Sequence, residues 1–182
     1  YLHGMCGEAR SDLEAWGSGV SGLGTIIALQ GNALCGRTGP RATASWTTNA
    51  AAIDARIDAA IEAVRARGVR LDADRLVLIG ESMGAARAEA LAARFPSKYR
   101  RLVLVGAPRT PKHLERTEAV ALLAGEKEWQ APMLDGAAAL AEHGLVARFW
   151  QLEGATHGAY GAEGDRILGD AVGFVVAHDA IR

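Results

Sequence analysis

The sequence predicts an α/β fold in which a mostly parallel central sheet is covered by helices on both faces. Short apolar runs alternate with longer segments of helical periodicity along most of the chain. The apolar runs carry no polar residue at every second position, as expected of strands buried on both faces. Crossover helices bury such strands in a parallel sheet. With 182 residues, the chain fits a single domain over residues 1–182.

The first part of the chain combines strand patterns with irregular stretches. Residues 1–4 look like the end of a strand whose leading neighbours are missing from the numbering. Residues 25–29 form a continuous apolar, β-branched run that predicts a strand buried on both faces. Residues 7–24 and 31–46 are rich in Gly and small polar residues. We expect these two stretches to be the least regular and to form loops that shape a substrate site.

The rest of the chain alternates regularly between helix and strand patterns. Apolar spacing or Ala-rich composition predicts helices at residues 49–67, 83–95, 132–143 and 164–178. Short apolar runs predict strands at residues 76–79, 101–105, 119–123 and 145–152. The segment between Gly106 and Ala119 has no room for a cap domain, so we expect an open site.

Composition and charge exclude several classes of partner. The net charge is −1, from 20 basic and 21 acidic residues, so the chain has no excess of basic residues that would bind nucleic acid or an anionic membrane. No apolar run approaches the roughly 20 residues that cross a bilayer. We therefore expect neither nucleic-acid binding nor a membrane span, while the oligomeric state stays open.

The two cysteines, Cys6 and Cys35, leave the compartment open. Both follow predicted strand ends, so both belong on the same rim of a parallel sheet, where a disulfide is geometrically reasonable. A disulfide would favour an exported protein. Two small buried thiols would instead favour a cytoplasmic one.

Residues 80–84 read Gly-Glu-Ser-Met-Gly and lie between a predicted strand and a predicted helix. G-x-S-x-G at such a junction is typical of a nucleophile elbow, a turn so tight that the serine is held above the sheet in a strained backbone conformation. The alternative is a serine in an ordinary strand-to-helix turn. We predict Ser82 as a nucleophile.

His157 is the preferred candidate for the base that a serine nucleophile needs. It lies in a Gly-rich loop just after the last predicted strand, and the C-terminal ends of parallel strands are where such sheets build their sites. His143 and His178 fall near predicted helix ends, where an imidazolium suits the helix dipole. His113 lies in a polar loop, and a surface loop position is also the alternative interpretation of His157.

The acid that orients the histidine is expected between serine and histidine in the chain. Glu128 stands three residues after Gly125, where the chain can turn its side chain back over the rim of the sheet. Glu126 is the nearest competitor, and Asp135 and Glu153 are more distant choices. A solvated loop charge is the ordinary alternative for any of these carboxylates.

An oxyanion hole and a pocket would complete such a site. The backbone N–H of Met83 follows the nucleophile, and the N–H of Met5 lies in the Gly-rich loop after residues 1–3. In this arrangement His3 shapes that loop and is not the base. Trp46 and Tyr160 are candidate substrate-binding residues, together with Trp16 and Trp129, although aromatic residues near loops are as often packing residues.

Four segments of the sequence jointly resemble the α/β-hydrolase superfamily, and the resemblance spans nearly the whole chain. They are the His-Gly loop at residues 2–5, the G-x-S-x-G of residues 80–84, the acid turn at residues 123–128 and the histidine loop at residues 154–158. The chain looks most like small lidless serine esterases of the carboxylesterase/phospholipase or dienelactone hydrolase type. In that superfamily the acid is more often Asp than Glu.

The resemblance implies a hydrolase of small-molecule carboxylic esters that works through an acyl-enzyme, with no organic cofactor and no metal. Thioesterases and peptidases on the same scaffold are alternatives. A non-catalytic binding protein of this fold is an alternative of a different class, favoured by the apparent lack of leading strands.

Overall fold

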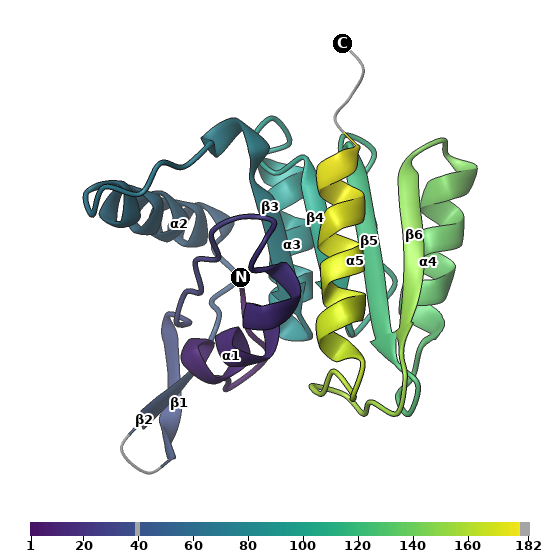
Figure 1. Cartoon of the computed structure of the whole chain (residues 1–182), viewed down its shortest axis with the longest axis horizontal. Coiled ribbons are helices and arrows are strands. Elements are labelled where there is room, and N and C mark those ends of the chain that lie inside the picture. Colours follow the sequence, from purple (N-terminus) through teal and green to yellow (C-terminus); the bar gives the residue numbers. More distant parts are fainter. Residues whose placement is uncertain (39–40, 179–182) are drawn as a thin grey trace.

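The computed structural model of the protein describes residues 1–38 and 41–178, and it has the predicted α/β architecture (Figure 1). A four-stranded parallel sheet has the strand order β3-β4-β5-β6. Its strands are β3 (Val77–Glu81), β4 (Arg101–Val105), β5 (Ala119–Gly125) and β6 (Val146–Leu152). All four lie where the apolar runs predict them.

Side chains of the central strands alternate between two apolar cores, one on each face of the sheet. On β4, Leu102 and Leu104 belong to one core, whereas Val103 and Val105 belong to the other. Every residue of β4 and β5 is buried. This two-sided burial explains why both strands read as continuous apolar runs without polar alternation.

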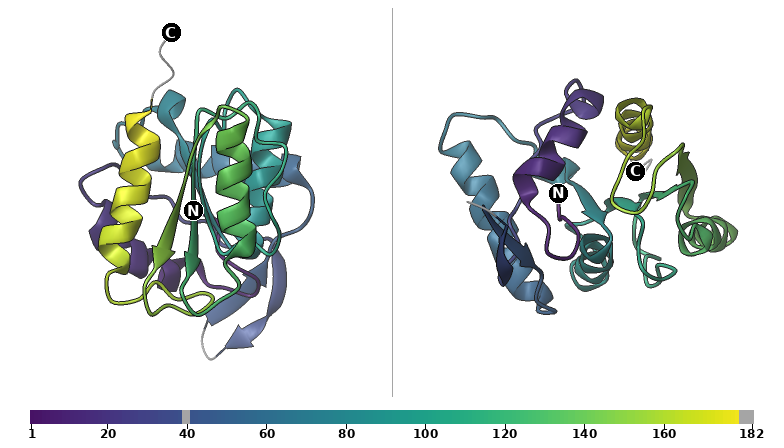
Figure 2. Two further views of the ribbon diagram at one scale, coloured as in Figure 1. Left: turned by 90° about the vertical axis from the view of Figure 1, so that its right-hand side faces the viewer. Right: turned by 90° about the horizontal axis from the view of Figure 1, so that it is seen from below.

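Helices form the two outer layers (Figure 2). α1 (Ala9–Val20) and α5 (Gly164–Ala177) pack on one face of the sheet. α2 (Ala50–Arg65), α3 (Met83–Arg94) and α4 (Ala131–Glu142) contribute to the core on the other face. α2 begins after Asn49, whose side chain accepts a hydrogen bond from the N–H of Ala52, and its buried residues have the predicted helical spacing.

The opening residues join the sheet through single parallel bridges. Leu2 pairs with Gly80 of β3 on one side and with Leu29 on the other. The prediction of a strand buried on both faces at residues 25–29 is wrong in extent. Leu29 is buried and makes the only bridge of this run, while residues 25–28 stay exposed or half-buried.

The two stretches predicted as least regular contain regular structure. Residues 7–24 include α1, in which Trp16 and Val20 are buried against the core that α5 also lines. Gly19 reads as a loop residue, but a Cβ there would collide with the carbonyl of Asp165, so the glycine lets α1 approach α5 closely. Residues 31–46 include an antiparallel hairpin of β1 (Ala33–Thr38) and β2 (Arg41–Ser45).

The C-terminal ends of the parallel strands lie at one edge of the sheet, the lower edge in Figure 1, where the β1–β2 hairpin also lies. Residues 106–118, which follow β4 at this edge, form only turns and irregular backbone. The described part of the chain therefore has no cap domain over this edge. None of its helices is both long and apolar enough to cross a membrane.

Candidate active site

Ser82 occupies a tight turn between β3 and α3. Its φ is 52° and its ψ −115°, a conformation that residues with a Cβ rarely adopt. The Ser82 N–H donates to the carbonyl of Val105 on the neighbouring strand at 2.8 Å. A Cβ on Gly84 would collide with the carbonyl of Leu2, and one on Gly80 with the carbonyl of Gly84. The turn fits between the strands because both flanking positions are glycine.

His157 links Ser82 to Glu128. Its Nδ1 lies 2.5 Å from Oε2 of Glu128, and its Nε2 lies 2.9 Å from Oγ of Ser82. Because a carboxylate only accepts hydrogen bonds, Nδ1 carries the proton and Nε2 accepts from the serine hydroxyl. The His157 side chain is 51% exposed, whereas that of Glu128 is 11% exposed. The buried Glu128 carboxylate thus holds the Nδ1 side of the imidazole, while about half of the His157 side chain is accessible to solvent.

The two glutamates of the turn after β5 have different contacts. Oε1 of Glu128 accepts the N–H of Gly125 at 2.6 Å, which fixes the carboxylate that contacts His157. Oε2 of Glu126 instead accepts the N–H of Gly154 at 2.8 Å. Glu126 therefore fastens the start of the histidine loop. Of the two competing candidates, Glu128 is the one that contacts the imidazole.

His3 is buried and holds the loop of residues 3–7. The N–H of Gly31 donates to its Nε2 at 2.8 Å, so the proton is on Nδ1, which donates to the carbonyl of Gly4 at 2.7 Å. The carbonyl of Gly4 and the N–H of Met5 belong to the same trans peptide and point in opposite directions. By fixing the carbonyl, His3 also fixes the direction of the predicted oxyanion donor at Met5.

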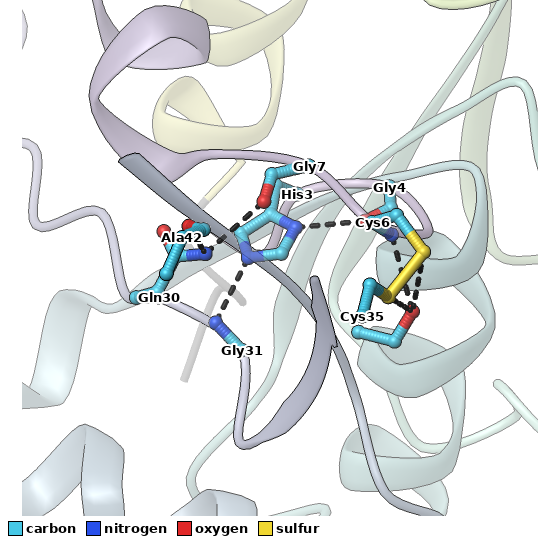
Figure 3. Close-up of a disulfide and its surroundings, with 9 residues drawn as sticks. His3, Gly4, Cys6, Gly7, Gln30, Gly31, Cys35 and Ala42 are labelled. Atoms are coloured by element: carbon cyan, nitrogen blue, oxygen red, sulfur yellow. Dashed lines mark hydrogen bonds between the residues drawn. A yellow bond between two sulfur atoms is a disulfide. The ribbon is translucent and has the colours of Figure 1, made fainter. Parts of the chain in front are cut away.

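A disulfide joins Cys6 of this loop to Cys35 of β1, with their Cα atoms 5.6 Å apart (Figure 3). The hydroxyl of Ser45 accepts from the N–H of Cys6 at 3.1 Å and lies 3.2 Å from Sγ of Cys35. Gly7 also forms an antiparallel bridge with Ala44 of β2. The loop is thus fastened to the hairpin by one covalent and several polar contacts.

The aromatic candidates occupy very different positions. Trp46 is buried, its ring lies tilted against that of His3 with centroids 5.0 Å apart, and its indole N–H donates to the His3 carbonyl at 2.8 Å. Trp46 therefore contacts the loop of residues 3–7 through the ring and the carbonyl of His3. Tyr160 accepts the indole N–H of buried Trp16 at 3.0 Å. Trp129, next to Glu128, is 73% exposed. The substrate-binding roles of Trp46 and Tyr160 stay predictions.

Glu81 is a site residue that sequence analysis missed. It is the second residue of the G-x-S-x-G pattern, a position that the pattern leaves free. In the structure its Oε1 lies 4.0 Å from Nε2 of His157, and its side chain is only 10% exposed. No signal in the sequence could have identified this contact, because it depends on the fold bringing the histidine loop over the end of β3.

Two negative observations delimit the site. A cavity of about 380 Å³ lies at the opposite end of the sheet, between α2 and the N-terminal ends of β3 and β4, and is lined by none of Ser82, His157 and Glu128. Among the described residues, no group of three or more His, Cys, Asp or Glu side chains is placed to hold a metal ion.

A serine, a histidine and a carboxylate are hydrogen-bonded in series at the C-terminal edge of a parallel sheet that helices cover on both faces. This arrangement is that of the α/β-hydrolase class. Residues 35–159 match the family model described as "alpha/beta hydrolase fold", and the chain belongs to that family. A comparison with curated proteins finds no match.

Solved structures share the fold. An uncharacterized protein from Bacillus cereus ATCC 10987 is 13% identical with a TM-score of 0.73, covering 96% of this chain, which spans only 57% of that protein. The Bacillus cereus carboxylesterase is 16% identical with a TM-score of 0.66, over 98% of this chain and 86% of the other. Esterase PE8 is 19% identical with a TM-score of 0.65, over 98% and 90%.

Proposed function

We propose that the protein is a serine hydrolase that cleaves carboxylic ester bonds through an acyl-enzyme intermediate. The observation that carries the proposal is the series Ser82–His157–Glu128, with heavy-atom separations of 2.9 and 2.5 Å. A serine hydroxyl becomes nucleophilic when a base removes its proton, and a carboxylate on the other ring nitrogen stabilises the imidazolium that forms.

In acylation, Oγ of Ser82 attacks the ester carbonyl carbon while its proton moves to Nε2 of His157. The tetrahedral intermediate collapses when the imidazolium returns that proton to the leaving alcohol. Water then attacks the acyl-enzyme, again through His157, and releases the acid. Glu128 keeps Nδ1 protonated and the ring in place throughout.

The oxyanion is assigned to the backbone N–H groups of Met83 and Met5. Met83 follows the nucleophile at the start of α3, where the helix dipole adds positive potential. The Met5 peptide is fixed through the carbonyl of Gly4, which His3 holds. Each such donor is worth about 3–4 kcal/mol of transition-state stabilisation in well-studied cases.

An ester is the preferred substrate bond for two reasons. The sequence resembles lidless serine esterases, and two of the structures that share the fold are a carboxylesterase and an esterase. The open edge and the half-exposed His157 side chain favour small or accessible acyl groups over long buried chains. Thioesters and amides are the other acyl donors that the same side chains could attack.

The test is labelling with a fluorophosphonate probe, followed by peptide mass mapping and by assays with p-nitrophenyl esters, thioesters and amides. We expect stoichiometric modification of Ser82, with no labelling and no turnover in Ser82→Ala. A folded wild-type protein that takes no label would overturn the proposal and leave a non-catalytic binding protein as the better interpretation.

A further inference from the structure

The buried carboxylate of Glu81 lies between the His-Gly loop and the imidazole of His157. Its Oε1 is 4.0 Å from Nε2 of His157. Its Oε2 lies so close to Gly4 that a Cβ on that residue would collide with it, and the same Cβ would meet Ser82. His157 therefore has a carboxylate near each ring nitrogen: Glu128 at Nδ1 and Glu81 near Nε2.

The partner of Nε2 must change during the proposed reaction. In the free protein, Nε2 lies 2.9 Å from Oγ of Ser82 and accepts a hydrogen bond from that hydroxyl. In the acyl-enzyme that oxygen is bonded to the acyl carbon and has no proton to donate. Nε2 is then available to the water that hydrolyses the intermediate. This argument rests on the function proposed above.

The separation of Nε2 from Glu81 suits one bridging water. At 4.0 Å the two atoms are too far apart for a direct hydrogen bond. Two hydrogen bonds of about 2.8 Å that meet at roughly a right angle span that gap. Such a water would donate one hydrogen to Nε2 and the other to Oε1, leaving a lone pair for the acyl carbon.

We propose that Glu81 is a positioning residue that holds the hydrolytic water against His157 during deacylation. The water oxygen bonds to the acyl carbon, and its first proton passes to Nε2. The bond from that carbon to Oγ of Ser82 then breaks, and Oγ takes the proton back from Nε2. Glu81 accepts the hydrogen bond of the second hydrogen, which stays on the acid product, and takes no proton itself.

This role makes Glu81 a determinant of which nucleophile is used. Water has a second hydrogen for the Glu81 carboxylate, and a hydrogen bond to a charged acceptor is stronger than one to a neutral acceptor. An alcohol has one hydroxyl proton, which must go to His157, so it gains nothing from Glu81. The carboxylate therefore favours hydrolysis over transfer of the acyl group to an alcohol.

The test is the partition of one acyl-enzyme between two nucleophiles. Wild type, Glu81→Leu and Glu81→Gln react with p-nitrophenyl acetate in buffer containing methanol, and the ratio of acetate to methyl acetate is measured. We expect that ratio to fall about tenfold in Glu81→Leu, and less in Glu81→Gln because the neutral amide oxygen still accepts a hydrogen bond. The ratio does not depend on how much of the protein is active.

The matched control is Glu126→Leu, a carboxylate on the same edge whose oxygen binds the N–H of Gly154. Its ratio should equal that of the wild type. An equal shift in Glu126→Leu, or an unchanged ratio in a Glu81→Leu protein that still labels at Ser82, would overturn the role of Glu81.

A second readout keeps the proposal testable if Glu81→Leu does not fold. In the isosteric Glu81→Gln, slower deacylation should lower kcat and produce a burst of p-nitrophenol, while kcat/KM, which reports acylation, stays near the wild-type value. An equal fall in kcat and kcat/KM without a burst would count against the proposal. If the wild type itself forms no acetyl-enzyme, the proposed function fails. That outcome is distinguishable from a wild type that forms the acetyl-enzyme and a Glu81→Gln variant that either does or does not show slower deacylation.

Discussion

Glu128 holds His157 with one carboxylate oxygen and the backbone of its own turn with the other. Oε2 contacts Nδ1 of His157 at 2.5 Å, while Oε1 accepts the N–H of Gly125 at 2.6 Å. The turn that carries Glu128 is also fixed to the histidine loop, because the N–H of Lys127 donates to the carbonyl of Ala155 at 2.9 Å. The direction of the carboxylate is therefore set by backbone contacts rather than by a free side-chain rotamer.

The first prediction compares the two glutamates of this turn. Glu128→Gln should lower kcat for p-nitrophenyl acetate by roughly a thousandfold or more, because an amide next to Nδ1 permits the wrong tautomer of His157. Glu126→Gln removes charge from the same turn without touching the imidazole, so its kcat should stay within about threefold of the wild type. The reverse order of the two effects would move the acid to Glu126.

The second prediction concerns the turn that presents Ser82. In Gly84→Ala the added Cβ would collide with the backbone carbonyls of Leu2 and His3. The Leu2 carbonyl accepts the N–H of Glu81 in β3, and the His3 carbonyl accepts the indole N–H of Trp46, so neither moves without loss of a hydrogen bond. We expect urea denaturation to show a loss of about 3 kcal/mol or more in unfolding free energy. Gly17→Ala is the matched control, because a Cβ there meets nothing within 4 Å.

Because Gly17 lies within α1, its replacement by Ala should be neutral or stabilising by about 0.5–1 kcal/mol. Equal unfolding midpoints for Gly84→Ala and the wild type would show that the backbone at Leu2 yields easily, and the steric account of this turn would then be wrong.

Strong local sequence patterns predict the fold and the position of the candidate site, but they do not predict α1 or the approach of Glu81 to His157. β4 and β5 could be predicted because both are buried on two faces and hence, apart from Arg101, apolar. Ser82 follows β3 and His157 follows β6, and the C-terminal ends of these parallel strands lie at one edge of the sheet. α1 could not be predicted, because Gly19 serves helix packing and resembles a loop residue in the sequence. The approach of Glu81 to His157 needs the tertiary structure.

The third prediction concerns the disulfide. Cys6 and Cys35 are separated by 29 positions, and linking them restricts the unfolded chain. Cys6→Ser/Cys35→Ser should therefore lose about 2–4 kcal/mol of unfolding free energy, measured by urea denaturation. Because the bridge fastens the loop that carries Met5, we also expect a lower kcat. Reductant should reproduce both effects in the wild type and leave the double variant unchanged, and a wild type insensitive to reductant would contradict the prediction.

The fourth prediction concerns buried Tyr99, whose hydroxyl donates to Oδ1 of Asp54 at 2.5 Å. Burial, with the hydrogen bond and charge of Asp54, raises the pKa of Tyr99 well above its ordinary value. Tyr99→Phe should cost about 1–3 kcal/mol of unfolding free energy at neutral pH. A raised folded-state pKa gives stability that is fully present below the unfolded pKa of about 10 and is lost as the pH rises above it. The cost of Tyr99→Phe should therefore shrink in urea titrations above that pH, whereas a cost that stays constant or grows would show that the pKa of Tyr99 is not raised in the folded protein.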